Sequence, residues 1–184
     1  MGRRRDDGPV LTTERLELRP FRLEDGEALH ALFTDADVRR WLLDDTVVPR
    51  GWVDEEIAES EARFAAGGGG LWALREPPAE SLIGFVGFRP FFEPAQMQLL
   101  YALLPAAWGR GLATEAATAA TAYAFDTLGF EEVRAATDTP NTASIAVLER
   151  LGFREWTRSE EGPAGTVFFR LGIERWRKGL TTRR

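Results

Sequence analysis

The stretch that decides the fold runs from Gln96 to Leu128 and reads QMQLLYALLPAAWGRGLATEAATAATAYAFDTL. Residues 96–104 predict a strand, and its second half is apolar on both faces, as in the centre of a sheet. Pro105 ends that strand. The alanine- and threonine-rich run at 112–128 predicts a helix that stops at Gly129. A strand and a helix joined by a glycine-rich turn are therefore expected at the centre of the fold.

The glycine-rich turn between this strand and this helix predicts an anion site. A helix leaves its first N–H groups without intrahelical partners, and the helix dipole adds positive potential at the same end. Glycine lets a ligand approach the backbone closely, so phosphate oxygens are the natural occupant. The amides expected to bind phosphate belong to Gly109, Arg110, Gly111, Leu112, Ala113 and Thr114.

Length and composition fit one hydrophobic core. The chain has 184 residues, of which 44% are hydrophobic, and we expect a single domain over residues 1–184 with flexible tails at about 1–8 and 176–184. It has no cysteine, which excludes disulfides and thiolate metal ligands, and we expect no metal. No apolar run reaches the roughly 18 residues of a membrane span. We expect a cytoplasmic monomer or homodimer without a membrane partner.

The charge is unevenly distributed. The net charge is −6, residues 1–7 carry +1 and residues 174–184 carry +4, so residues 8–173 carry −11. An acidic body repels nucleic-acid backbones and attracts cations, which disfavours a nucleic-acid partner. Nine acidic residues against three arginines lie between Asp35 and Glu61. These acids fit either a solvated helix face or an acidic lip that attracts an amine or a basic peptide.

The rest of the chain predicts a mixed sheet. Alternating or apolar runs predict strands, and apolar residues at helical spacing predict helices. The expected strands are 11–19, 71–75, 82–89, 132–137, 153–157 and 166–171, and the further expected helices are 24–33, 52–66 and one from about 141 to 151. This order predicts an α/β (α+β) fold with a mixed, mostly antiparallel central sheet flanked by helices.

The glycine turn also allows a dinucleotide reading. Residues 109–114 read GRGLAT, a near match to the dinucleotide fingerprint, with Thr114 in place of the third glycine. The fingerprint belongs to the first strand of a parallel fold, and 70 residues after Thr114 are too few for a second nucleotide-binding half. A dinucleotide-binding oxidoreductase is therefore the weaker alternative.

Three motifs resemble one known family, and they occur in the family's order. The segment YALLPAAWGRGLATEA at 101–116 resembles the acetyl-CoA signature of the GNAT superfamily of N-acetyltransferases. The segments LTTERLELRPF at 11–21 and NTASIAVLERLGF at 141–153 resemble the branch that includes ribosomal-protein N-terminal (alanine/serine) acetyltransferases.

The resemblance implies a GNAT-like sheet with a splayed central strand pair and acetyl-CoA as the acetyl donor. It places the pyrophosphate of CoA on the turn at 109–114, in agreement with the anion site, and the pantetheine arm beside the strand at Tyr101–Leu103. It also places Asn141 and Ser144 near the pantetheine and the sulfur, although Asn141 fits an N-cap as well. The residues expected to contact CoA are Tyr101, Leu103, Gly109, Arg110, Gly111, Leu112, Ala113, Thr114, Asn141 and Ser144.

We expect direct attack of a neutral amine on the thioester. Ser144 or a water is the expected proton donor to the leaving thiolate, and Tyr101 and Tyr123 are the alternative acids. Relatives often carry a glutamate near Gln98, so this chain shows no obvious carboxylate base. At pH 7, deprotonating an α-amine costs about 1 kcal/mol, whereas a lysine side chain costs about 4.6 kcal/mol. The expected acceptor is therefore a primary amine of low pKa, in a protein N-terminus or a small molecule.

The absence of an obvious base leaves a second function open. A CoA-binding sensor or interaction module would keep the fold and the phosphate site but would lack turnover. The sequence thus predicts an acetyl-CoA-dependent N-acetyltransferase and leaves the sensor as its alternative.

Overall fold

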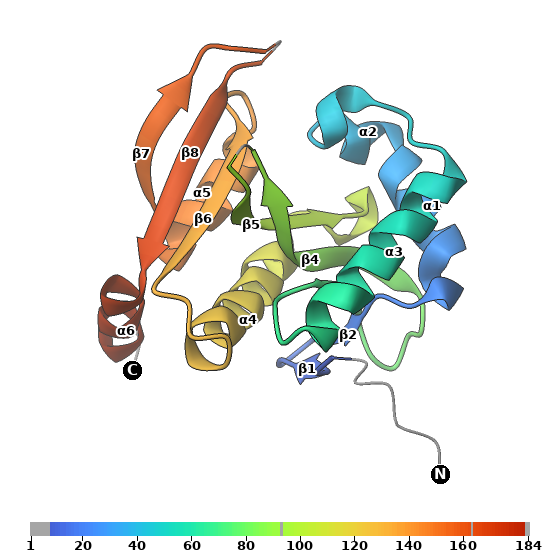
Figure 1. Cartoon of the computed structure of the whole chain (residues 1–184), viewed down its shortest axis with the longest axis horizontal. Coiled ribbons are helices and arrows are strands. Elements are labelled where there is room, and N and C mark those ends of the chain that lie inside the picture. The colour runs from blue at the N-terminus through green and yellow to red at the C-terminus, as the bar shows by residue number, and fades with distance from the viewer. Residues whose placement is uncertain (1–7, 93, 163, 183–184) are drawn as a thin grey trace.

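The computed structural model describes residues 8–182 apart from 93 and 163, and the described residues form an eight-stranded sheet with helices on both faces (Figure 1). The strand order is β1-β2-β3-β4-β5-β6-β8-β7, and every described neighbouring pair except β5 and β6 is antiparallel. The predicted mixed, mostly antiparallel sheet is confirmed. The strands are β1 (Leu11–Thr12), β2 (Glu17–Pro20), β3 (Leu71–Arg75), β4 (Leu82–Phe91), β5 (Gln96–Leu103), β6 (Glu132–Asp138), β7 (Arg154–Ser159) and β8 (Thr166–Gly172).

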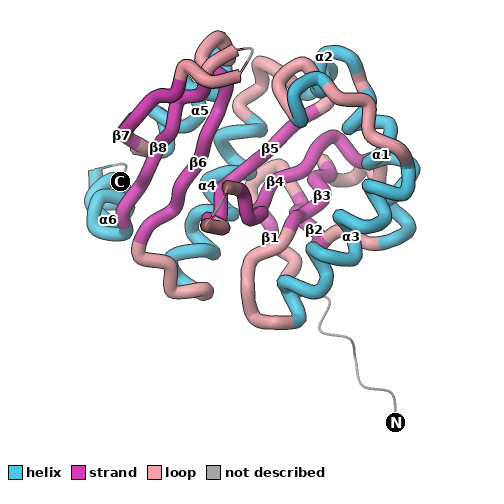
Figure 2. Tube along the Cα trace, turned by 45° about the horizontal axis from the view of Figure 1, so that its top comes forward, coloured by secondary structure: helices cyan, strands magenta, loops and turns pink. Residues whose placement is uncertain are grey.

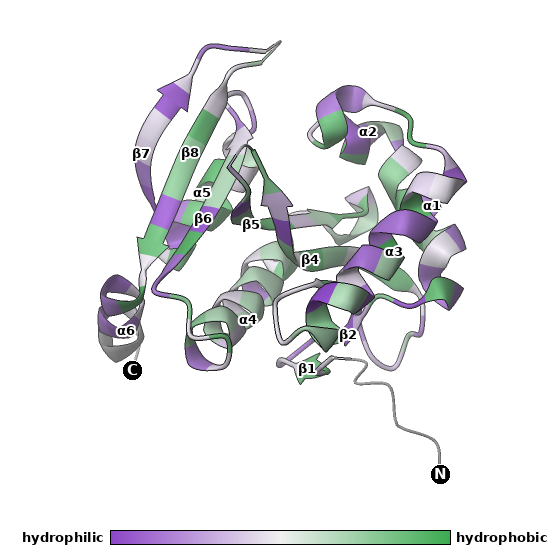
Figure 3. Cartoon of the chain, in the orientation of Figure 1, coloured by the Kyte–Doolittle hydropathy of each residue, from purple (hydrophilic) through white to green (hydrophobic). Residues whose placement is uncertain are grey.

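The helices divide between the two faces of the sheet. Helices α1 and α3 pack on one face, and α4 and α5 pack on the other (Figure 1). In Figure 3, α4 is mostly hydrophobic, whereas α3 shows a strongly hydrophilic outer side. The helices are α1 (Gly26–Thr34), α2 (Ala36–Arg39), α3 (Arg50–Ala65), α4 (Leu112–Asp126), α5 (Thr142–Leu151) and α6 (Ile173–Thr182), with short 3₁₀ turns at Leu23–Asp25, Leu43–Asp45 and Pro105–Ala107.

Each face of the sheet has its own hydrophobic cluster, because side chains alternate along a strand. In β3, Trp72 and Leu74 pack into the cluster shared with α4 and α5, whereas Leu71 and Ala73 pack into the cluster shared with α1 and α3. The ring of Trp72 is fully buried and meets that of Tyr123 in α4 edge-on, with centroids 5.4 Å apart. The sheet is therefore anchored from both sides.

The centre of the sheet is splayed, as predicted. β5 and β6 run parallel, and within the described chain their register contains the single pair Gln98 and Arg134. In contrast, β5 pairs with β4 along its whole length. The strands labelled β5 and β6 can be followed in Figure 2 on the two sides of this break. Beyond Gln98, the edge of β5 that faces β6 has no strand partner among the described residues.

The first predicted strand was wrong in detail. The structure divides 11–19 into β1 and β2, which form a hairpin, and Thr13 donates its N–H to the carbonyl of Leu16 at 2.9 Å in the turn. Both Leu16 and Leu18 are buried. The other predicted strands and helices agree with the observed bounds to within about two residues, while the short α2 was not predicted.

The C-terminal tail was also predicted wrongly. Residues 176–184 were expected to be flexible, but α6 extends to Thr182, and Trp176 is 5% exposed. Its ring packs on Phe125 of α4, with centroids 5.8 Å apart. The segment 174–184 carries five cationic residues, and its sequence was therefore interpreted as a charged tail and not as an amphipathic helix. The N-terminal tail expected at 1–8 lies outside the described residues except for Gly8.

The docking of α6 gives a stability prediction. Replacing Trp176 by Ala should lower the free energy of unfolding by about 3–5 kcal/mol, because it leaves a cavity against Phe125. Trp41, which is 37% exposed, provides the control, and Trp41→Ala should cost clearly less. Urea unfolding of both variants measures the difference. Equal losses would mean that α6 does not contribute to the core.

Candidate active site

The turn before α4 presents a row of unpaired backbone amides. Gly109 and Gly111 have φ values of +71° and +79°, which glycine adopts without strain. Gly111 is the N-cap of α4, and no side chain caps the helix. Among the described residues, none of the amides of Gly109–Thr114 has a protein acceptor. Phosphate oxygens can therefore be bound at the positive end of α4.

The side chains of this turn do not occupy the anion site. Arg110 donates from Nη1 to Oε2 of Glu76 at 2.9 Å, so its guanidinium is held by a neighbouring loop. Leu112 is fully buried and fixes the first turn of α4 in the core. Ala113 and Thr114 are half-buried. The predicted residues of this segment can therefore act on an anion through the main chain.

The β1–β2 hairpin packs against the same turn. Glu115 in α4 accepts from Oγ1 of Thr13 at 2.6 Å and from Nε of Arg15 at 2.7 Å. Burial raises the pKa of Glu115, but the hydrogen bonds from Thr13 and Arg15 outweigh it and hold that pKa below its ordinary value. Arg15 also donates from Nη1 to the carbonyl of Arg110 at 2.9 Å. A cation thus lies beside the open amides, and its Nη2 would be 3.6 Å from a Cβ at Gly111.

The edge of β5 that faces β6 carries exposed backbone groups. Leu104, the residue after β5, donates its N–H to the carbonyl of Ile83 in β4 at 2.8 Å. Because hydrogen-bonded pairs alternate in antiparallel strands, the backbone groups of Tyr101 and Leu103 point away from β4. The indole Nε1 of Trp108 donates to the Leu103 carbonyl at 2.6 Å. The backbone groups of Tyr101 and the N–H of Leu103 are therefore available to hydrogen-bond the expected pantetheine arm. The carbonyl of Leu103 is not, because it already accepts from Trp108.

Three predicted residues meet across the splay. The hydroxyl of Tyr101 lies 2.9 Å from Oγ of Ser144 and donates to the Ser144 carbonyl at 3.2 Å. Asn141 is the N-cap of α5, as the sequence indicated, and its Oδ1 accepts the Ser144 N–H at 3.1 Å. Burial raises the pKa of Tyr101 to about 12, although the hydrogen bond with Ser144 opposes the shift. The phenol therefore keeps its proton at neutral pH and can donate it.

A carboxylate lies on the other side of the same strands. Asp138 is the last residue of β6, and because Val133 and Ala135 point into the α4–α5 cluster, the alternation of side chains directs Asp138 to the opposite face. Burial raises the pKa of Asp138, and the negative charge of Asp44 raises it further. Asp44 belongs to the 3₁₀ turn after α2. These two aspartates come from distant parts of the sequence and mark one end of the splay.

Gln98 does not replace the missing base. Its side chain is 4% exposed, and its Oε1 has no hydrogen-bond partner within the described chain. An amide cannot take up a proton at neutral pH. Asp138 is a candidate carboxylate that the sequence analysis did not single out. Its position three residues before Asn141, at the end of a predicted strand, could have indicated that it lies near the site. Arg15 belongs to the N-terminal motif at 11–21, but the sequence analysis did not name it as a site residue.

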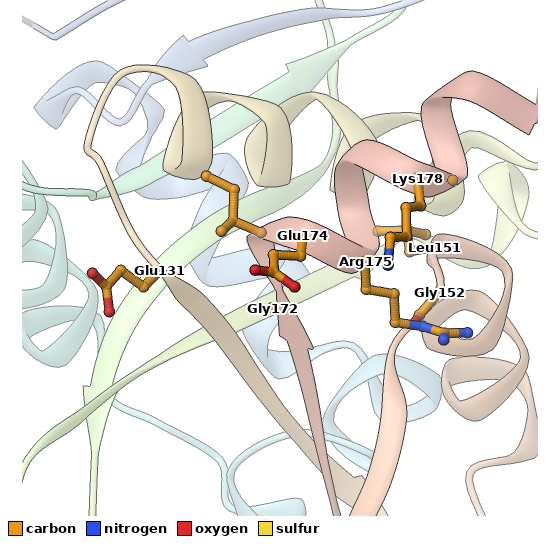
Figure 4. Close-up of a pocket in the computed structure, with 9 residues that line it drawn as sticks. Glu131, Leu151, Gly152, Gly172, Glu174, Arg175 and Lys178 are labelled. Carbon is orange, nitrogen blue, oxygen red and sulfur yellow. The ribbon is translucent and has the colours of Figure 1, made fainter.

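A pocket lies away from these residues. It has a volume of about 620 Å³ between α6, the end of α5 and the loop before β6 (Figure 4). Arg175 donates from Nε to the carbonyl of Gly152 there at 2.6 Å, and Figure 4 shows Glu131 and Glu174 on the other side. This pocket contains neither the glycine turn nor Tyr101 and Ser144.

Two negative findings apply to the described residues. No group of three or more histidine, cysteine, aspartate or glutamate side chains among them could hold a metal ion. None of their helices combines the length and the apolar character that crossing a membrane requires.

Comparison with known proteins gives consistent matches. The family model of the acetyltransferase (GNAT) domain matches residues 15–154. The uncharacterized N-acetyltransferase YoaA of Bacillus subtilis is 28% identical over 148 residues, which cover 80% of this chain and 84% of YoaA.

Solved structures share the fold. A GNAT-family acetyltransferase from Bacillus anthracis superposes with a TM-score of 0.75 at 21% identity, covering 90% of this chain and 99% of that chain. RimL, a ribosomal L7/L12 alpha-N-protein acetyltransferase solved in complex with coenzyme A, superposes with a TM-score of 0.77 at 15% identity, covering 91% and 99%. The parallel fold required by the dinucleotide reading is thereby excluded.

The glycine turn gives a binding prediction. Gly111→Val should raise the Kd for CoA about tenfold or more, because a β-branched side chain is strained at this φ and blocks approach to the amides. Gly162→Val is the matched control, since Gly162 also has a positive φ and open space around it but lies in the β7–β8 turn. Calorimetric titration with CoA tests both variants. Unchanged affinity in folded Gly111→Val would contradict the placement of the phosphates.

Proposed function

Because the chain belongs to the GNAT family of acetyltransferases, which use acetyl-CoA as donor, we propose that its acceptor is the α-amino group of a polypeptide. The enzyme is an acetyltransferase; the identity of the acceptor is the proposal. The arrangement that carries it is the splay of β5 and β6, with a proton donor on one side and Asp138 on the other. We further propose that the reaction takes place in the cytoplasm.

The residues around the splay fit the donor. The six open amides of Gly109–Thr114, with Arg15 beside them, are suited to the pyrophosphate. The free backbone groups of Tyr101 and the N–H of Leu103 are suited to the amide groups of the pantetheine arm. The Nδ2 of Asn141 is left over from capping and could bind the same arm. When bound, acetyl-CoA supplies the thioester that the amine attacks.

The side chains divide the two proton transfers between them. On the acceptor side, Asp138 takes the proton of the incoming ammonium, so that the neutral amine can form the new C–N bond. On the other side, the hydrogen-bonded hydroxyls of Tyr101 and Ser144 supply a proton to the sulfur as the C–S bond breaks. The nitrogen loses two protons as the ammonium becomes the amide: Asp138 takes the first before attack, and the second leaves once the C–N bond has formed and restores the proton that the hydroxyls give to the sulfur.

The chemistry of the base favours an α-amine. The raised pKa of Asp138 makes it a stronger base than an ordinary aspartate. A single aspartate is nevertheless a weak base for a lysine ammonium, whose deprotonation at pH 7 costs about 4.6 kcal/mol against about 1 kcal/mol for an α-amine. This difference supports a polypeptide N-terminus as the acceptor.

The acceptor class is tested with paired peptides. One set has a free N-terminus and no lysine, and the other has a blocked N-terminus and one lysine. Thiol release from acetyl-CoA should be at least about tenfold faster with the first set. Faster transfer to lysine would contradict the proposal. CoA binding without thiol release on any acceptor would instead favour the sensor.

The role of Asp138 gives a pH prediction. The base must be ionised, so activity should fall as pH drops through the pKa of Asp138, which lies above the ordinary aspartate value. Asp44→Asn removes a negative charge that raises this pKa, so the acid limb of kcat/KM should move to lower pH. Asp138→Asn should lower kcat about 100-fold or more.

The control for this measurement is a neighbouring aspartate. Asp45 forms an ion pair with Nε of Arg39 at 3.0 Å, and Asp45→Asn should leave the acid limb in place. If Asp44→Asn and Asp45→Asn moved the acid limb of kcat/KM equally, the shift would be a general effect of surface charge. No movement in Asp44→Asn would remove Asp138 as the base.

A further inference from the structure

Three arginines lie side by side on one face of the sheet. Arg134 of β6 pairs with Arg170 of β8, and Arg170 pairs with Arg154 of β7. Residues directly opposite each other in antiparallel strands share a face. The neighbouring Leu171 and Phe169 point into the α4–α5 cluster, so the arginines point the other way. This side of β6, β8 and β7, called the open face below, is turned to the viewer in Figure 1, with α5 behind it.

The arginines are poorly neutralised. Like charges directly opposite each other in a sheet are destabilising. Arg134 has a carboxylate partner in Glu132, at 2.8 Å. Within the described part of the chain, no carboxylate lies at ion-pairing distance from Arg154 or Arg170. In a body with a net charge of −11 at residues 8–173, this local excess of positive charge is a specific feature that a partner could neutralise.

Aromatic rings border the arginines. The guanidinium carbons of Arg134 and Arg170 lie 5.8 Å and 5.7 Å from the ring centroid of Trp156, which is 50% exposed. A β-bulge at Glu155/Thr157 inserts Trp156 into this position. Phe92, 47% exposed, packs on Phe168 with centroids 5.5 Å apart. The open face therefore combines positive charge with exposed aromatic surface, the composition of a binding surface.

The open face leads to the candidate base. Asp138 and Arg134 point to the same side of β6 and are four residues apart, which corresponds to about 13 Å along the strand. An extended peptide covers that distance in about four residues. A chain whose amine lies at Asp138 would thus bring its fourth and fifth residues to the arginines.

We propose that the open face selects acceptor polypeptides that carry aspartate or glutamate near their fourth and fifth residues. The inference rests on the proposed function and adds the sequence class of the acceptor. The acceptor lies extended along β6. Because side chains of an extended chain alternate between its two faces, one of the two carboxylates faces the row of Arg134, Arg170 and Arg154. Apolar side chains on the same face of the acceptor contact Trp156 and Phe168.

Two other occupants fit less well. A second copy related by twofold symmetry would bring two arginine rows together, which charge repulsion disfavours. A nucleic acid would meet the acidic remainder of the surface, and three cations give it a weak electrostatic site.

The test uses three N-terminal peptides that are identical except at positions four and five, which hold two glutamates, two glutamines or two lysines. Wild-type kcat/KM should be about tenfold or more higher for the glutamate peptide than for the lysine peptide. The double variant Arg154→Glu/Arg170→Glu should reverse this order, while the glutamine peptide changes by less than about threefold. Arg158→Glu is the matched control, because Arg158 lies on the other face of β7 and should leave the order intact.

The outcomes separate the two proposals. Acetylation of all three peptides at equal rates, or an order that the double variant does not change, overturns the charge selection and leaves N-terminal acetylation standing. No transfer to any N-terminus overturns both. A wild-type dimer that the double variant dissociates, measured by sedimentation, or RNA binding that it abolishes, would assign the open face to another occupant. Circular dichroism melting confirms that the double variant is folded.

Discussion

The divergence of β5 from β6 after the pair Gln98 and Arg134 is the constraint on which the rest of the structure depends. A backbone that loses its strand partner must satisfy its N–H and C=O groups elsewhere. Here Trp108 satisfies one carbonyl, of Leu103, and the hydroxyl of Tyr101 reaches Ser144 across the gap. The remaining groups are left for a ligand that can pair like a strand. An interruption in the sheet therefore creates the site that we propose for the donor.

Charge is arranged around this interruption in three separate zones. At the glycine turn, positive potential comes from backbone amides and Arg15, although the body of the protein is acidic. At the other end, Asp138 and Asp44 come together, where a cation is favoured. Beyond them, the arginines of the open face favour anions again. An anionic donor and an acceptor with a cationic end can thus approach from different sides without competing for the same charges.

The sequence analysis succeeded where function depends on local backbone structure. The open amides of Gly109–Thr114 follow from two glycines before a helix, and the cap at Asn141 follows from its place before α5. It failed where the role of a residue depends on a distant partner. In the sequence, Asp138 is an ordinary residue at the end of a strand, and only the structure shows the influence of Asp44 on it. Similarly, Trp176 lies in a cationic segment, and only the structure shows that its ring packs on Phe125.

The sequence by itself determined the class of fold, the glycine turn with its open amides and the family, because these depend on short contiguous motifs whose conformation is set by neighbouring residues. Tertiary structure alone decided which side chains share the splay, which two aspartates come together at its end and which arginines form a row. Those properties depend on strand register and on the face to which each side chain points, and a shift of one residue would reverse every face.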